Sequence, residues 1–345
     1  MGAQLTINVA IATYDAIVLG CDSLSSVVER AIFPFRENSA FALDANGNQI
    51  RDADGNLVVA LRQDQLAYTA TSVMGGVRKM FVLYEDANGQ CDCSVAAVTS
   101  GMATIDGVTI AEHANRYRLA LMRDKVRFGT VEEAAAHFLA HVRVLWENEY
   151  VRLGYTHPSQ AALHFLVAGY CGEDARFKIF RISVEENQSK DQLAHEPFTG
   201  AAWDGQSNFA ARLLMGVDPN LQDQVNRGIV DALRAQRESL LKSFTEAIAA
   251  AGIADLELEL NETLPAAPPW SSAIAPIDWG NMPVQTAVEL VSALVNTESG
   301  MQKFVQGIPV VGGRTRIGLL RRNTPFAMLN EPALTHAHTG YQTDA

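Results

Sequence analysis

The sequence predicts an α+β protein in which two antiparallel sheets are stacked on each other and helix pairs cover their outer faces. The main observation is the order of elements, which runs strands, two helices, strands, helices and a last strand. Runs of strands separated by pairs of helices differ from the one-to-one βαβα order of a parallel sheet. The second observation is the composition: 345 residues, 48% hydrophobic and 19% charged, are typical of a packed globular protein.

The first element is a hairpin over residues 6–22. Ile7, Val9 and Ile11 alternate with polar or small residues, and Tyr14-Asp15 provides a tight connection into the second arm, AIVLGCD. That arm is apolar on both faces, which is typical of a strand buried from both sides. We therefore expect this hairpin inside the layered structure.

A short repeat follows between residues 27 and 76. The tetrapeptides at 44–47 (DANG) and 52–55 (DADG) are joined by a third copy at 86–89. Asn-Gly and Asp-Gly tolerate positive φ, so each copy is interpreted as a hairpin tip. A calcium loop is the alternative, but the copies lack its twelve-residue spacing and terminal glutamate.

The middle of the chain predicts a strand pair and then two helices. The strands are expected at 77–84 and 93–99, around the third turn. The first helix should begin near Ala103, and the second should be capped by Thr130 with Glu133 three residues later. Because a short loop joins the two helices, they should pack antiparallel.

The second half of the chain repeats the alternation. Strands are expected at 162–171, 177–183, 198–205 and 314–321, and helices at 207–216, 219–251 and 284–299. The proline-rich apolar stretch 256–280 predicts an ordered excursion or an interface arm. We expect one domain over 1–322, with insertions at about 27–75 and 218–280, followed by a loosely held tail over 323–345.

Charge and composition exclude several function classes. The formal net charge of -12 disfavours nucleic acid as a partner, and no apolar stretch is long enough for a membrane span. The N-terminus lacks the features of a signal peptide, so a cytoplasmic location is predicted and the four cysteines are expected to be free thiols. Cys91-x-Cys93 and His336-x-His338 lack the paired spacing of a zinc site, so no metal and no cofactor are expected.

Several short motifs resemble one known family. Thr6 opens the first strand, and Asp22 follows sixteen positions later in IVLGCDS. Lys79 lies in VRKM (77–80), and SGMA (100–103) follows the next strand. With AGYCGEDARFKIFRIS and the closing VGGRTRIGLL, these motifs resemble the proteasome β-type family of N-terminal nucleophile (Ntn) hydrolases. The resemblance covers about 6–26, 76–122, 162–217 and 284–321.

The resemblance implies a four-layer αββα Ntn-hydrolase sandwich and a set of site residues. Thr6 would be the nucleophile after removal of residues 1–5, with Lys79 and Asp22 as its helpers. The amide of Gly101 would stabilise the oxyanion. Ser207 would supply a further hydroxyl, although it is also suited to cap the helix that follows. Residues 308–313 (IPVVGG) replace the family's Asp-x-x-Ser-Gly-Gly.

These residue types fit amide hydrolysis. A threonine hydroxyl needs a base, which in this class is its own α-amino group, with an ordinary pKa of about 7.7 to 8.0. A nearby lysine ammonium lowers that pKa, and Asp22 would hold Lys79 in place. The simpler interpretations are a strand-starting Thr6, a turn-capping Asp22 and an edge-strand Lys79.

The leading hypothesis is a threonine-type peptidase or amidohydrolase that acts on a peptide or amide substrate. The resemblance also implies a homo-oligomer, as a ring or stacked rings, and leaves open an unfoldase partner. The alternative is a catalytically inactive proteasome-type scaffold or binding subunit, because fold alone does not decide activity. A third reading is a small-molecule amidase that uses the same nucleophile.

Overall fold

The computed structural model describes residues 6–31, 41–59, 67–86, 91–155, 157–217, 219–252, 270, 274–304 and 311–330. The chain divides into two compact units. The first comprises Met1–Ser207 and Asp278–Ala345, and the second comprises Asn208–Ile277. Both large sheets belong to the first unit.

The first sheet has five antiparallel strands in the order β12-β1-β2-β13-β14. Its strands are β1 (Ile7–Ala12), β2 (Ala16–Cys21), β12 (Gly200–Gly205), β13 (Arg316–Arg321) and β14 (Ala327–Met328). The predicted opening hairpin is present, and β1 and β2 are buried along their whole length. The expected last strand pairs with β2, and β14 adds an edge within the segment after residue 323.

The second sheet has five antiparallel strands in the order β11-β10-β9-β6-β5. Its strands are β5 (Met80–Glu85), β6 (Ser94–Gly101), β9 (Leu163–Tyr170), β10 (Lys178–Ser183) and β11 (Gln188–Asp191). Apolar side chains from both sheets form one buried cluster, which includes Leu19 from the first sheet and Leu166 from the second. The two sheets are therefore stacked face to face, as the sequence predicts.

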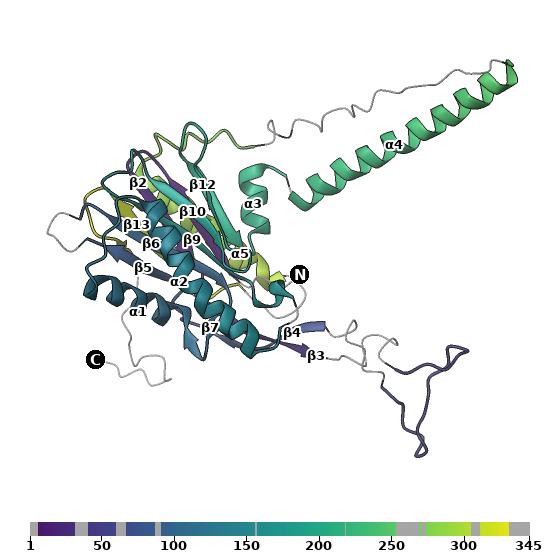
Figure 1. Ribbon diagram of the computed structural model, residues 1–345, viewed down its shortest axis with the longest axis horizontal. Coiled ribbons are helices and arrows are strands. Elements are labelled where there is room, and N and C mark those ends of the chain that lie inside the picture. Colours follow the sequence, from purple (N-terminus) through teal and green to yellow (C-terminus); the bar gives the residue numbers. More distant parts are fainter. Residues whose placement is uncertain are drawn as a thin grey trace. The chain divides into compact units, whose positions relative to one another are not determined.

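Helices cover the outer faces of this stack (Figure 1). On the second sheet, α1 (Ile110–Arg123) packs on β5 and α2 (Val131–Arg152) packs on β9 and β10. On the first sheet, α5 (Val284–Met301) packs on β1 and β2. The close approach needs Gly20, since a Cβ there would lie 2.2 Å from Val291.

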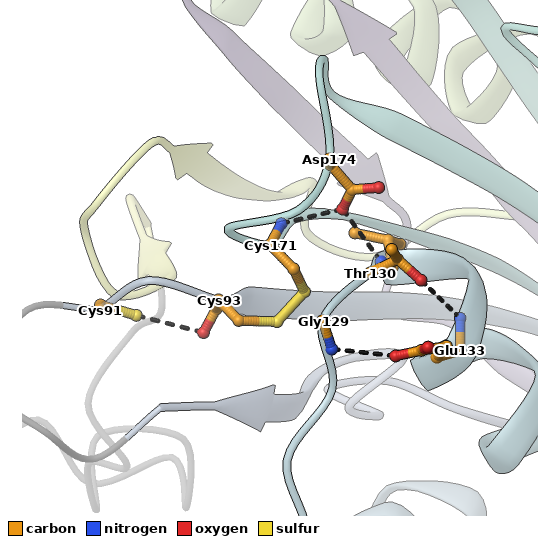
Figure 2. Close-up of a disulfide and its surroundings, with 8 residues drawn as sticks. Cys91, Cys93, Gly129, Thr130, Glu133, Cys171 and Asp174 are labelled. Carbon is orange, nitrogen blue, oxygen red and sulfur yellow. Dashed lines mark hydrogen bonds between the residues drawn. A yellow bond between two sulfur atoms is a disulfide. The ribbon is translucent and has the colours of Figure 1, made fainter.

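The first long helix begins later than the sequence predicts. Instead of starting near Ala103, the chain forms a short hairpin of β7 (Thr104–Ile105) and β8 (Val108–Thr109), and α1 begins at Ile110. The reason is the Asp106-Gly107 turn, in which both residues have positive φ. Thr109 then caps the helix by accepting a hydrogen bond from the N–H of Glu112. The predicted cap of α2 is confirmed, with Thr130 accepting from the N–H of Glu133 (Figure 2).

The first insertion contains the expected turns. In both DANG and DADG, the first aspartate accepts hydrogen bonds from backbone N–H groups of its own turn, and Gly47 and Gly55 have positive φ. The strand β3 (Ser25–Ala31) lies before these turns in the chain and β4 (Ala67–Met74) lies after them. The two strands pair with each other as a separate antiparallel ribbon. Of the third copy (86–89), residues 87–89 lie outside the described residues.

The second unit contains two α-helices among its described residues. It contains α3 (Asn208–Met215) and α4 (Pro219–Ala250), which contact each other. The backbone of Ala275 returns to Leu214, and the indole of Trp270 donates to the side chain of Asn226. Within the described residues, no helix is long and apolar enough to cross a membrane.

Cys93 and Cys171 form a disulfide (Figure 2), so the prediction that all four cysteines are free was wrong. The two cysteines come together because Ser94 of β6 pairs with Tyr170 of β9, which places the neighbouring residues opposite each other. Cys21 and Cys91 are free and buried. The same end of the sheet holds the start of α2, since Asp174 accepts hydrogen bonds from the N–H groups of Cys171 and Val131.

Counting thiols tests the disulfide directly. Without reductant, the denatured protein should expose two reactive thiols, from Cys21 and Cys91, and four after reduction. A count of four without reductant would contradict the pairing. Because disulfides persist mainly in oxidising compartments, the count also bears on the predicted cytoplasmic location.

Candidate active site

Thr6 lies directly before β1 and is almost fully buried, with 4% of its surface exposed. Its carbonyl oxygen accepts a hydrogen bond of 2.6 Å from the N–H of Gln206, beyond the end of β12. Gly205 has a positive φ of 81°, and a Cβ there would lie 1.9 Å from the Thr6 oxygen. The backbone of β12 therefore fixes the position of Thr6.

Asp22 follows β2 and is fully buried. In the hairpin of β1 and β2, Asn8 pairs with Cys21. Asp22, the next residue after β2, therefore lies beside Ile7 at the start of β1. Asp22 Oδ1 accepts from the N–H of Ile7 at 3.2 Å. Its Oδ2 accepts from the N–H groups of Leu24 and Gly312, each at 3.1 Å. Asp22 thus links three separate parts of the first unit.

Lys79 lies just before β5, and its side chain joins the other two residues. Its ammonium nitrogen donates to Thr6 Oγ1 at 2.7 Å and lies 2.8 Å from Asp22 Oδ1. Lys79 is 5% exposed, so this is a buried ion pair. Burial raises the pKa of the Asp22 carboxyl group, and the Lys79 charge and the backbone N–H donors oppose that effect.

A cavity of about 40 Å³ adjoins this cluster. It is lined by Thr6, Ser25, Ser26, Val77, Arg78, Lys79, Thr99, Ser100, Gly101, Met102, Ala103, Thr109 and Ile110. The volume exceeds what one water molecule needs. Thr6 lines this cavity, so a water molecule has room beside it.

Gly101 lines the same cavity at the end of β6. It has a positive φ of 93°, and a Cβ there would lie 2.1 Å from the carbonyl oxygen of Ala162. Only glycine fits this backbone position. Its role as oxyanion donor stays a prediction.

Ser207 is placed differently from the other predicted residues. It precedes α3, is half-buried and does not line the cavity. The structure therefore brings together Thr6, Asp22, Lys79 and Gly101, whereas Ser207 does not line their cavity, although its neighbour Gln206 donates to the Thr6 carbonyl oxygen.

Sequence reasoning missed a second buried polar cluster beside the cavity. Ser100 donates a short hydrogen bond to Asp204, and His164 lies 3.4 Å from the same carboxylate. The sequence predicts residue 204 only as part of the strand 198–205, and nothing in it links Ser100, His164 and Asp204, because they come from strands far apart in the chain. The available signal was a polar residue on the inward face of each otherwise apolar strand.

No cluster of three or more histidine, cysteine or acidic side chains suited to a metal ion occurs among the described residues. Cys93 is part of the disulfide, and His336 and His338 lie outside the described residues.

No protein-family profile matches this sequence, and a search of curated proteins finds no match either. The fold is similar to that of solved Anbu structures. Anbu (ancestral beta-subunit) from Yersinia bercovieri has 10% identity and a TM-score of 0.42 over 94% of this chain and 88% of that chain. An Anbu (Gly-1) mutant from Hyphomicrobium sp. strain MC1 has 10% identity and a TM-score of 0.44 over 97% of this chain and 90% of that chain.

Adding one methyl group at Gly205 tests how closely Thr6 is held. Gly205→Ala should cost about 1 kcal/mol for the left-handed backbone and about 1 to 3 kcal/mol more for the clash with the Thr6 oxygen. Gly107→Ala is the matched control, because Gly107 also has positive φ but has no atom within 4 Å of a Cβ position. Urea unfolding of both variants measures the difference, and equal losses would contradict the close contact.

Proposed function

We propose that this protein is a threonine-type Ntn hydrolase that cuts amide bonds, with Thr6 as its nucleophile once residues 1–5 have been removed. The observation that carries the proposal is the buried contact of Lys79 with both Thr6 and Asp22. Burying a lysine and a carboxylate together costs desolvation free energy, and here the lysine also donates to a buried hydroxyl. Such specific arrangements of charged groups are typical of functional sites.

The geometry suits activation of the hydroxyl. Lys79 donates a hydrogen bond to Thr6 Oγ1, so the proton of the Thr6 hydroxyl points away from Lys79. A base on that other side of the oxygen can take the proton. Cleavage of the bond between Leu5 and Thr6 would create that base, an α-amino group on Thr6 itself. The Lys79 ammonium nearby would lower the pKa of the new amine below its ordinary value of about 7.7 to 8.0.

The remaining steps would use Gly101, which lines the same cavity as Thr6. Attack of the Thr6 oxygen on an amide carbonyl forms a tetrahedral oxyanion, and an N–H donor at Gly101 would stabilise it by roughly 3 to 4 kcal/mol. The amine that leaves takes a proton from the α-amino group, and water then hydrolyses the acyl ester.

Substrate and assembly belong to the same proposal. We infer a peptide or amide substrate and, from the motif resemblance, a homo-oligomer in a four-layer αββα fold. The alternative is an inactive scaffold or binding subunit. The apolar segment at 308–311 favours this alternative, because the resemblance expects polar supports for the Thr6 amine there.

Intact mass tests the nucleophile. Purified protein should lose residues 1–5 and begin at Thr6, while Thr6→Ala should keep its full length because it lacks the attacking hydroxyl. Ser25→Ala, which removes another hydroxyl of the same cavity, is the control and should be processed normally. A wild-type chain that keeps residues 1–5 and is not labelled by a peptide epoxyketone would support the inactive scaffold instead.

Removing the Lys79 charge tests its role in activation. Lys79→Met should slow epoxyketone labelling of Thr6 at least about 100-fold, because the amine loses its neighbouring cation. Lys178→Met is the matched control. Lys178 of β10 also pairs with an aspartate, Asp191 of β11, at 2.9 Å, but it does not line the cavity. Labelling rates are measured by mass spectrometry. Equal rates in the two variants would remove Lys79 from the mechanism.

A further inference from the structure

A second cluster of charged groups lies between the two sheets beside the Thr6 cavity. Its centre is Asp204 on β12, which is 2% exposed and shares its strand face with Ala202 of the inter-sheet core. Asp204 Oδ2 accepts the short hydrogen bond from Ser100 Oγ and lies 3.4 Å from His164 Nδ1. Its Oδ1 lies 2.8 Å from the Arg181 guanidinium. One carboxylate of the first sheet thus contacts β6, β9 and β10 of the second.

His164 connects Asp204 to a second carboxylate. Its Nε2 lies 2.5 Å from Glu185 Oε1, and Glu185 Oε2 accepts from the N–H of Leu163. Arg143 of α2 donates to the backbone oxygen of Glu185 and so holds this turn. The contacts alternate in charge from Asp204 through His164 to Glu185.

The charges of the cluster support one another. Burial alone lowers the pKa of His164, but its contacts with Asp204 and Glu185 outweigh burial and raise the pKa to about 9. Burial alone would raise the pKa of Asp204, but His164, Ser100 and Arg181 hold it below its ordinary range. At neutral pH the centre of the cluster is therefore an imidazolium between two carboxylates.

The cluster touches both walls of the proposed active site. On one side, Asp204 binds Ser100, which directly precedes Gly101 and lines the cavity with it. On the other side, the next two residues of the chain hold Thr6: Gln206 donates to the Thr6 carbonyl oxygen, and Gly205 packs against it. Residues 204–206 therefore connect the nucleophile to the predicted oxyanion donor.

We propose that Asp204 is a positioning residue: it holds Ser100, and through it Gly101, at a fixed separation from Thr6, and His164 orients its carboxylate. This inference rests on the proposed function of Thr6. The reason that such a contact matters is geometric, because a shift of about 1 Å between reacting groups can cost about 100-fold in rate.

Labelling kinetics of the processed protein, which begins at Thr6, with a peptide epoxyketone test this role. Asp204→Asn and Ser100→Ala should lower the maximal labelling rate, by about 100-fold for Asp204→Asn, with the half-saturating probe concentration nearly unchanged. Ser100→Ala removes one hydroxyl and keeps the test valid if Asp204→Asn does not fold. Asp174→Asn is the matched control, a buried aspartate at the other end of β9 that should label at the wild-type rate.

A pH profile separates positioning from simple structural support. The charged groups facing His164 are Asp204 from β12, Arg181 from β10 and Glu185 after β10. The wild-type maximal rate should fall above about pH 9, where His164 loses its proton. Glu185→Gln removes one of the anions that retain this proton, so the fall should move about one pH unit lower.

Each result decides something. If the wild type is labelled and Asp204→Asn and Ser100→Ala match its maximal rate, the positioning role is wrong while the proposed function stands. The same conclusion follows if Glu185→Gln leaves the pH profile unchanged. If the wild type is never labelled at Thr6, the proposed function fails and the inference fails with it.

Discussion

The buried ion pair between Lys79 and Asp22 is the interaction on which the candidate site depends. Taking two charges out of water costs several kcal/mol for each ion, and the structure offsets this cost by supplying Asp22 with three backbone N–H donors besides the ammonium. Those donors come from the start of β1, the loop after β2 and the segment before β13. An apolar pair of similar size would often be as stable, so the arrangement argues for a required geometry at Thr6 more than for stability.

Close backbone contacts then fix the two walls of the cavity. At Gly205 the missing Cβ leaves room for the Thr6 carbonyl oxygen, and at Gly101 it leaves room for the Ala162 carbonyl oxygen. Both glycines also have positive φ, which side chains with a Cβ rarely adopt. The proposed nucleophile and the predicted oxyanion donor are thus held by main chain, whose position varies far less than that of a side chain with several free torsions. Asp204 adds a side-chain link between these walls.

Local sequence signals predicted the parts of the fold that depend on neighbours in the chain. The alternation in residues 6–22 predicted the hairpin, and its register alone brings Asp22 beside Ile7. The start of α1 was missed because the Asp106-Gly107 turn lies inside an otherwise helical pattern. Lys79 is 57 positions from Asp22, so only the family resemblance suggested their contact. The Cys93–Cys171 disulfide and the Ser100–Asp204 bond depend on which strands become neighbours, which periodicity does not encode.

The two polar clusters also explain why Thr6, and not Ser100, is the better candidate for the nucleophile. Ser100 donates a hydrogen bond to Asp204, whose lowered pKa makes this carboxylate a weak base. His164 does not help, because its raised pKa keeps it protonated at neutral pH. Neither of these two described neighbours is therefore able to take the Ser100 proton in the range where general bases work best. Thr6 instead accepts a hydrogen bond from Lys79, and processing would give it an amine whose ordinary pKa of about 7.7 to 8.0 is suited to that task. The same cavity thus has two hydroxyl residues in its wall, Ser100 bonded to a carboxylate and Thr6 bonded to an ammonium, and only the second fits the proposed nucleophile.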